Sequence, residues 1–219
     1  MTTTKPDAFE ISGYMAELSA TIEKLPLSDI GRIVHLFFTA YRDGRTIFLL
    51  GNGGSAVLAS HMACDLGKGT ASASGRRLRA VALTDNVALI TAWANDTNYE
   101  KIFAEQLENL LDPGDVVFAI SGSGNSPNVL AALDFARRAG AVTGGLTGFN
   151  GGRMKPLCHV CAVVPSGNMQ IIEDLHLSIA HSVFRALVHQ IEQTGRHRGG
   201  IALSSSASIA SRAASAGNG

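Results

Sequence analysis

Two turns rich in glycine and serine each follow a short apolar segment and could bind a phosphate group. GNGGS at residues 51–55 follows the apolar run 47–50, and SGSGNS at residues 121–126 follows the apolar run 116–120. A helical pattern leaves each turn, and Ser55 is expected at the N-cap of the first helix. Glycines let backbone N–H groups approach an anion, and the dipole of a helix N-terminus favours its charge. Two such turns on one sheet predict a ligand with a phosphate end and a polyol end.

Two pairs of histidine and carboxylate residues could bind a metal ion or transfer protons. His61 and Asp65 are one helical turn apart and therefore share a helix face. Glu173 and His181 are eight residues apart in a later helical segment and also lie on roughly one face. Imidazole nitrogens and carboxylate oxygens are common zinc ligands. Either pair alone is typical of an ordinary amphipathic helix, but the presence of two pairs favours a site. His176 is left open between an orienting role near this site and a surface position.

The elements that must position these residues alternate between strand and helix. A long helix is predicted at 171–193, and two helices, 9–25 and 27–41, precede the first strand. Alternation of this kind implies a parallel sheet covered by helices on both faces, in which ligands bind beyond the carboxyl ends of the strands. Apolar runs predict strands at 46–50, 80–83, 116–120, 141–147 and 160–164.

Composition limits the possible partners and the domain organisation. Among 219 residues, 18 basic and 18 acidic side chains give a formal net charge of zero. This balance argues against a nucleic-acid or membrane partner. The sequence has neither an uninterrupted apolar stretch of about 20 residues nor a signal-peptide core, and three cysteines do not form a disulfide framework, so a cytoplasmic protein is expected. We expect a loose segment at 1–8, a single domain at 9–196 and a disordered or weakly helical Ser/Ala/Gly-rich tail at 197–219.

The motifs taken together resemble the sugar isomerase (SIS) fold, and most closely the phosphoheptose isomerase family. They are GNGGS at 51–55, AND at 94–96, SGSGNS at 121–126 and LTGFNGG at 146–152, and the resemblance covers roughly residues 9–193. It implies a flavodoxin-like three-layer α/β domain with an N-terminal helical pair. It also implies an aldose–ketose isomerase of a sugar phosphate, with conversion of sedoheptulose 7-phosphate to a mannoheptose 7-phosphate as the expected reaction.

The resemblance implies a role for each candidate residue. Asp65 would move a proton between two sugar carbons, and His181 would be the partner acid or base. A homotetramer with active sites at subunit interfaces is implied as well, so charges at Phe37 and Phe38 would be expected to dissociate it. The phosphate would bind Ser121, Ser123 and Ser126, the sugar would lie near Asn52, Ser55 and Asp96, and zinc would bind His61, Asp65, Glu173 and His181.

Three departures from the family pattern leave the substrate open. Asp65 stands where the family usually has Glu, Glu173 where it has Gln, and Gly122 where it commonly has Thr. An isomerase of another ketose phosphate is therefore one alternative. A second is a non-catalytic SIS protein that binds a replication-initiator protein. Proteins of that kind generally lack the last-helix histidine, which this chain has as His181.

Overall fold

A five-stranded parallel sheet forms the centre of the molecule. The computed structural model describes the backbone of residues 8–71 and 76–215, with side chains described for residues 10–71 and 76–194. The strand order is β2-β1-β3-β4-β5, and every neighbouring pair is parallel. The sequence prediction of a parallel α/β sheet is thereby confirmed. The strands are β1 (Thr46–Gly51), β2 (Arg79–Ala82), β3 (Val116–Ser121), β4 (Val142–Thr147) and β5 (Val160–Val163).

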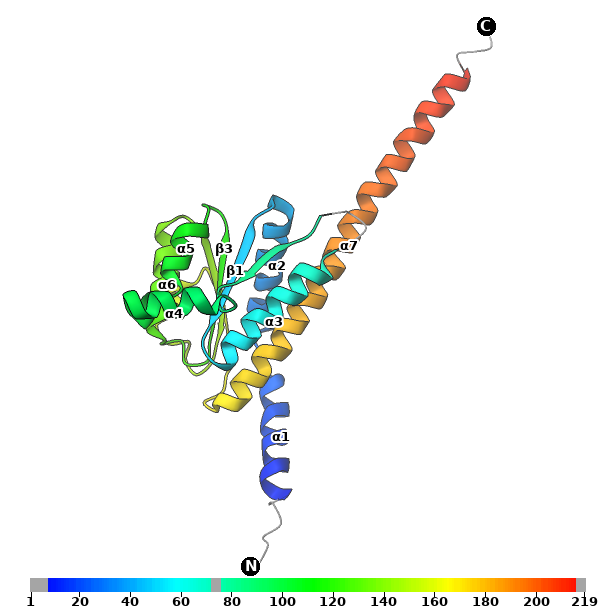
Figure 1. Ribbon diagram of the computed structural model, residues 1–219. Helices are drawn as coiled ribbons and strands as arrows, with labels where there is room; N and C mark the ends of the chain where they lie inside the picture. Colours follow the sequence, from blue (N-terminus) through cyan, green and yellow to red (C-terminus); the bar gives the residue numbers. More distant parts are fainter. Residues whose placement is uncertain (1–7, 72–75, 216–219) are drawn as a thin grey trace, which may run out of the picture.

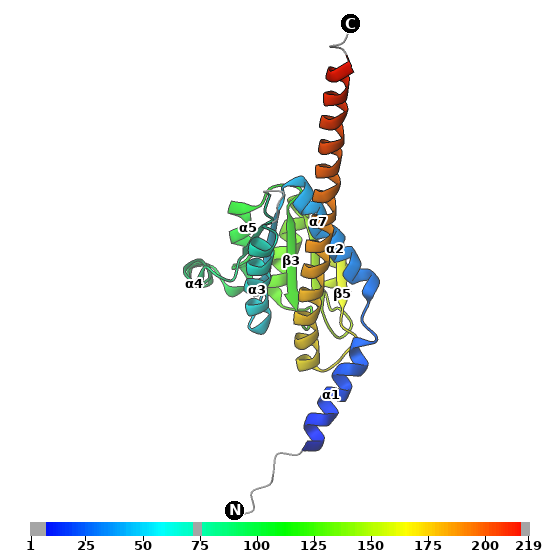
Figure 2. The ribbon, with the colours of Figure 1, turned by 90° about the vertical axis from the view of Figure 1, so that its right-hand side faces the viewer.

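Helices cover both faces of the sheet. The helices α2, α3 and α7 lie on one face, and α4, α5 and α6 lie on the other (Figure 1). The first helix, α1, extends away from the sheet and meets the rest of the domain near the start of α7 (Figure 2). The bounds are α1 (Ala8–Ile22), α2 (Leu27–Asp43), α3 (Gly54–Gly69), α4 (Val87–Asp96), η1 (Tyr99–Lys101), α5 (Ala104–Leu110), α6 (Pro127–Arg138), η2 (Lys155–Leu157) and α7 (Met169–Ser215).

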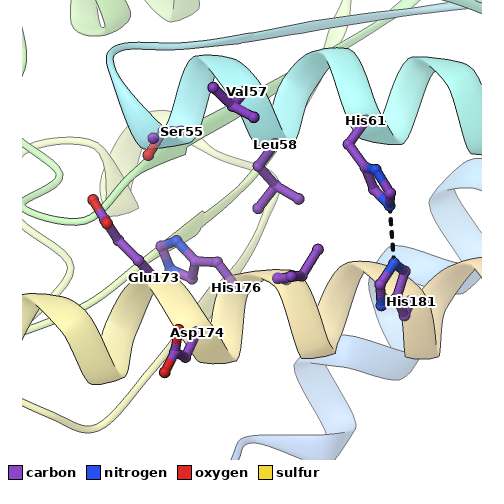
Figure 3. Close-up of a pocket in the computed structure, with 10 residues that line it drawn as sticks. Ser55, Val57, Leu58, His61, Glu173, Asp174, His176 and His181 are labelled. Carbon is purple, nitrogen blue, oxygen red and sulfur yellow. Dashed lines mark hydrogen bonds between the residues drawn. The ribbon is translucent and has the colours of Figure 1, made fainter.

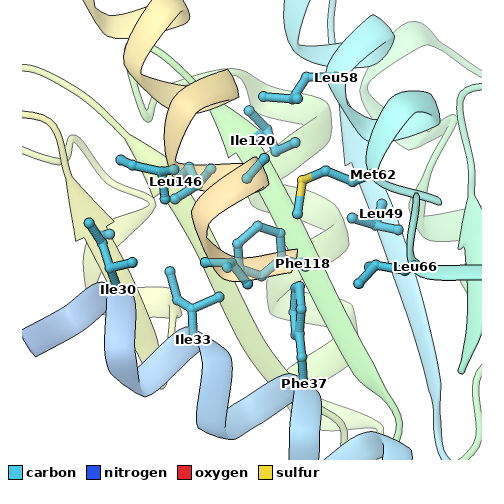
Figure 4. Packing of buried hydrophobic residues seen from close by; sticks show 14 of the residues in the cluster. Ile30, Ile33, Phe37, Leu49, Leu58, Met62, Leu66, Phe118, Ile120 and Leu146 are labelled. Carbon is cyan, nitrogen blue, oxygen red and sulfur yellow. The ribbon is translucent and has the colours of Figure 1, made fainter. Parts of the chain in front are cut away.

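The central strands are buried on both sides because their side chains alternate between two cores. Phe118 and Ile120 of β3 point toward α2, α3 and α7, whereas Val117 and Ala119 point toward the opposite helical layer. Phe37 of α2 is fully buried and packs edge-on against Phe118, with ring centroids 5.0 Å apart (Figure 4). The two cores hold β1 and β3 firmly at the centre of the sheet.

The strand order creates a ligand crevice at the carboxyl ends of β1 and β3. The chain leaves β1 toward β2 on one side, and from β3 it continues to β4 and β5 on the other side. In open α/β sheets this reversal is where ligands bind. Asn52 follows β1 and the serine turn 121–126 follows β3, so both predicted phosphate-type turns lie at this edge.

The start of α3 differs from the sequence prediction. The helix begins at Gly54, its N-cap is Gly53, and no side chain caps it, so the expected N-cap role of Ser55 is wrong. Gly53 has φ of 53°, a left-handed value that glycine adopts without steric cost. The turn therefore closes two residues earlier, and Ser55 lies inside the first helical turn, where it is buried.

The ends of the chain were predicted only in part. The N-terminal segment 1–8 lies almost entirely outside the described residues, since α1 begins at Ala8. Residues 197–215 continue α7, which is the helical one of the two alternatives expected for the tail, and 216–219 lie outside the described residues (Figure 2). The division of the chain at residue 196 stays a prediction. Within the described part of the chain, every helix is too short or too polar to cross a membrane.

Candidate active site

Two histidines and an aspartate converge where α3 and α7 lie side by side. Nε2 of His61 is 2.9 Å from Nε2 of His181 (Figure 3). The same His61 nitrogen is 3.3 Å from Oδ2 of Asp65. Nε2 of His181 is 3.9 Å from the same carboxylate oxygen. One ligand atom from each residue lies within 4.8 Å of the others. Two imidazole nitrogens and a carboxylate oxygen at this separation fit a zinc ion and would leave a coordination position open for a ligand.

Glu173, the fourth residue of the predicted metal set, does not join this group. Its carboxylate lies beside Gly54 at the N-terminus of α3, where the helix dipole favours a negative charge. Glu173 and His181 share a helix face, but eight residues correspond to a rise of about 12 Å along the axis. A shared helix face therefore does not bring the Glu173 carboxylate to the histidines, because this rise separates the two residues.

A pocket of about 300 Å³ connects Glu173 with the histidine cluster. Ser55 and Glu173 lie at one end and His61 and His181 at the other, with apolar side chains between them (Figure 3). A long pocket with polar ends suits an extended polar ligand. Its complete lining is Gly54, Ser55, Val57, Leu58, His61, Glu173, Asp174, His176, Leu177 and His181.

His176 is a pocket residue whose position the sequence left open. It is only 1% exposed, which excludes the surface position. Neither ring nitrogen makes a hydrogen bond of normal geometry with a described residue. Burial lowers the pKa of His176 from 6.5 to about 4, and the Thr147 backbone offsets this effect only in part. Its spacing of three residues from Glu173 and five from His181 is the sequence signal that could have placed it in the site.

The serine turn presents hydroxyl groups at the N-terminus of α6. Oγ of Ser121 accepts a hydrogen bond from the Gly124 amide at 3.2 Å and lies 3.4 Å from Oγ of Ser126. Ser126 occupies the N-cap position of α6, yet its side chain makes no capping hydrogen bond. Ser123 lines an open hollow of about 830 Å³ beside this turn. Hydroxyls and amides at a helix N-terminus are suited to a phosphate.

Gly122, which stands where the family commonly has threonine, lies against the flexible Met169 side chain at the start of α7. A Cβ atom at Gly122 would overlap the sulfur of Met169 at the start of α7. The chain thus places α7 against the serine turn where a larger residue would need more room. Glycine at position 122 therefore leaves room for the first turn of α7 to pack on the serine turn.

Asn52 and Asp96 have different surroundings. The side-chain amides of Asn52 and Asn128 exchange two hydrogen bonds, of 2.9 and 2.8 Å, and the Tyr99 hydroxyl donates to Asn52 at 3.2 Å. Asn52 is therefore fixed at the carboxyl end of β1. Asp96 ends α4 in the opposite helical layer, is exposed, and accepts a hydrogen bond from Asn95. Asn52 lies at the carboxyl end of β1, but the linings of the α3–α7 pocket and of the hollow beside Ser123 include neither Asn52 nor Asp96.

Sequence comparisons agree with this geometry. The family model described as SIS domain matches residues 13–148. A phosphoheptose isomerase of Aquifex aeolicus is 39% identical over 166 residues, which are 76% of this chain and 86% of the relative. The chain belongs to the phosphoheptose isomerase family.

Solved structures of phosphoheptose isomerases have the same fold. The protein from Francisella tularensis superimposes with a TM-score of 0.78 at 27% identity, covering 85% of this chain and all of that chain. The protein from Neisseria gonorrhoeae gives a TM-score of 0.76 at 28% identity, covering 81% and 96%. The three-layer SIS fold with N-terminal helices, expected from the motifs, is confirmed.

Proposed function

We propose that this chain is an aldose–ketose isomerase of sugar phosphates, and that it interconverts sedoheptulose 7-phosphate and a mannoheptose 7-phosphate. The observation that carries the proposal is the convergence of His61, Asp65 and His181 in a chain that is 39% identical to a protein named phosphoheptose isomerase. The serine turn at the N-terminus of α6 supports the phosphate part of the substrate.

The reaction is an internal proton transfer. The Asp65 carboxylate takes a proton from the carbon beside the carbonyl and returns it to the neighbouring carbon, through an enediol. His181, whose Nε2 lies 3.9 Å from that carboxylate, moves the second proton between the two sugar oxygens. No atom is gained or lost, so both groups end in their starting protonation states.

The other predicted residues bind and orient the substrate. Ser121, Ser123 and Ser126 hold the phosphate with the amides at the start of α6. Fixing one end of the sugar restricts the reacting carbons to a narrow range of positions, which lowers the entropic part of the barrier. The roles of Asn52, Ser55 and Asp96 toward the sugar stay predictions from the family resemblance.

A zinc ion is part of the proposal. His61, Asp65 and His181 would hold it, because their donor atoms converge, whereas Glu173 lies outside the group. The chemistry that zinc supplies when bound is polarisation of the sugar carbonyl.

The alternative of a non-catalytic partner-binding protein is less well supported. The discriminating residue, His181, is present and lies within 3.9 Å of Asp65 and 2.9 Å of His61. Such a cluster of proton-transfer groups has no function in a purely structural partner. A partner-binding protein would also carry no metal in the cluster, so metal content separates the two functions.

A homotetramer located in the cytoplasm completes the proposal. The helix α1 exposes Ile11, Met15 and Ile22, each by half or more, and such a surface is typical of a subunit contact. The three cysteines are free and none of the described helices could span a membrane, which supports a cytoplasmic location. The formal net charge of zero gives no support for a nucleic-acid partner.

Isomerisation in D₂O tests the reaction directly. The protein is incubated with sedoheptulose 7-phosphate, with and without a chelator, and the products are followed by NMR. Proton transfer through an enediol predicts an aldose product whose former carbonyl carbon carries the transferred proton, or deuterium where the proton held by Asp65 has exchanged with the solvent. Absence of an aldose in both conditions would rule out the heptose reaction. A thermal-shift panel of other ketose phosphates then identifies a different substrate, since ligand binding raises the melting temperature.

A further inference from the structure

His176 is a polar residue that the fold buries beside the backbone of Thr147. Its side chain is 1% exposed, and neither Nδ1 nor Nε2 makes a hydrogen bond of normal geometry with the described residues. Buried polar groups nearly always have a hydrogen-bond partner, because leaving one unpaired costs free energy. A position of this kind needs an explanation other than packing, for which a leucine would be better suited.

The residue lies in the wall of the α3–α7 pocket. Figure 3 shows its ring on the side of α7 that faces α3, between Glu173 and the apolar side chain of Leu58. It is one to two turns from His181 along α7, and it lies near the backbone of Thr147 at the carboxyl end of β4. The ring thus stands between the crevice at the strand ends and the histidine cluster, on the path that an extended ligand would follow.

The chemistry of the ring identifies the kind of ligand group that it can bind. Burial keeps the imidazole neutral at physiological pH, because its pKa falls to about 4. A neutral imidazole offers one N–H donor and one nitrogen acceptor. Sugar hydroxyls can both donate and accept, and therefore satisfy both nitrogens. A phosphate would leave the acceptor nitrogen unpaired, and it would favour a protonated ring.

We propose that His176 is a substrate-binding residue, and that it exchanges hydrogen bonds with hydroxyl groups of the sugar chain in the pocket between α3 and α7. The inference rests on the proposed function, because the ligand is the polyol part of a sugar phosphate. It assigns this pocket to the carbon chain of the substrate and the serine turn to its phosphate.

Two substitutions test this assignment. His176→Leu removes both polar nitrogens, and His176→Gln keeps a donor and an acceptor. The probe is the alditol phosphate made by borohydride reduction of sedoheptulose 7-phosphate, which lacks a carbonyl and cannot isomerise. Calorimetry should give a Kd that is raised roughly 10- to 100-fold in the leucine variant and largely restored in the glutamine variant. KM for the ketose should rise in parallel, while kcat changes less.

The thermal stability of the His176→Leu variant shows whether His176 serves ligand binding or the stability of the fold. If the orphaned nitrogens are kept for a ligand, the free leucine variant should melt at or above the temperature of the unsubstituted chain. A folded leucine variant that binds the alditol phosphate as tightly as the unsubstituted chain would overturn the inference. A leucine variant that fails to fold would do the same, since it would assign His176 to the structure. If the unsubstituted chain neither isomerises the ketose nor binds the alditol phosphate, the proposed function itself is wrong.

Discussion

Asp65 has a role both in the proposed proton transfer and in the proposed zinc site. One of its carboxylate oxygens lies 3.3 Å from Nε2 of His61 and 3.9 Å from Nε2 of His181. The side chain is one methylene shorter than the glutamate usual in the family, but α3 and α7 lie close enough for it to reach both rings. The shorter residue therefore still brings its carboxylate next to both imidazole rings.

Asp65→Asn should remove the proton-transfer step while keeping the size of the side chain. We expect kcat for the heptose to fall by about 100-fold or more, because general-base catalysis contributes at least that factor. Asp65→Glu is the matched control, since it keeps the carboxylate, and it should retain measurable activity. NMR-monitored turnover checks both variants, and an unchanged kcat in Asp65→Asn would contradict the proposed role.

The zinc content of variants shows whether the metal is bound by His61, Asp65 and His181 alone or also by Glu173. Zinc measured by mass spectrometry should be lost in His61→Ala and retained in Glu173→Gln, because Glu173 lies outside the cluster. Removing the metal with a chelator should lower activity, and added zinc should restore it. Equal loss of zinc in both variants would mean that Glu173 is a ligand after all.

His176 should make the stability of the protein depend on pH. Its pKa is about 4 in the folded chain against 6.5 for a free side chain, so between these values the unfolded chain binds the additional proton. The free energy of unfolding should therefore fall as the pH falls from 6.5 to 4, by roughly 3 kcal/mol from this residue. Above pH 6.5 the contribution is constant.

Urea unfolding of the unsubstituted chain and of His176→Leu at several pH values isolates this effect, because the carboxylates common to both chains cancel. The difference in free energy of unfolding should change between pH 4 and 6.5 and stay flat above. A difference that is flat over the whole range would show that folding does not lower the pKa of His176.

At the scale of elements, the first turns of α7 pack directly on the ends of β3 and β4. A Cβ atom at Gly148 would overlap side-chain carbons of Ile172, much as one at Gly122 would overlap Met169. These two glycines let α7 approach the sheet edge closely enough for Glu173 and His176 to line the pocket. The packing of α7 on the ends of β3 and β4 therefore determines where the pocket residues of α7 lie.

Gly148→Ala should lower the free energy of unfolding by about 1 to 3 kcal/mol, as expected when a well-packed region is overfilled. Combining it with Ile172→Val, which removes the nearest carbon, should cost less than the sum of the two single substitutions. Gly167→Ala is the matched control, because a Cβ atom there has no neighbour within 4 Å. Denaturant unfolding measures the free energy of unfolding of all four variants. If the changes from Gly148→Ala and Ile172→Val are strictly additive in the double variant, the proposed contact between Gly148 and Ile172 is wrong.

Local patterns in the sequence were sufficient for most elements but not for their spatial relations. Each strand was predicted to within about one residue, because buried parallel strands are continuous apolar runs. Helical periodicity gave the face on which Glu173 lies but not the rise that separates it from His181. The burial of His176 depends on how α7 packs on β4, which no local pattern contains. The early start of α3 depends on the backbone freedom of Gly53.

At the scale of the whole molecule, the two N-terminal helices leave different amounts of apolar surface for assembly. Phe37 is fully buried against Phe118 within one chain, so a charge at this position should unfold the subunit and not dissociate an oligomer. The expectation for Phe37 is therefore wrong. Phe38 is only partly buried and stacks on Tyr41. The exposed apolar residues of α1 are instead the better candidates for a subunit contact.

The dimensions of one subunit favour an active site shared between copies. Met169 packs on the serine turn at Gly122, and His181 follows it by twelve residues, a rise of about 18 Å along α7. An extended seven-carbon phosphate spans only roughly 10 Å, on the basis of ordinary covalent bond lengths. A substrate whose phosphate is held by the serine turn of one chain would therefore reach the level of His176 on α7 of that chain, seven residues after Met169, but would fall short of His181. We therefore expect the histidine cluster to come from a neighbouring subunit, as the family resemblance implies.

Mixed oligomers test this sharing. Ser123→Asp should abolish activity by repelling the phosphate, and His181→Ala should abolish it by removing the acid–base partner. When the two chains are co-expressed and purified together through different affinity tags, some sites combine an intact serine turn with an intact histidine cluster. We expect activity to return in part in the mixed oligomers, while each single variant stays inactive. If every site lies within one chain, each site still contains one defect and the mixed oligomers stay inactive. Sedimentation of the same samples gives the number of subunits, and a fully active monomer would contradict the assembly that the exposed face of α1 indicates.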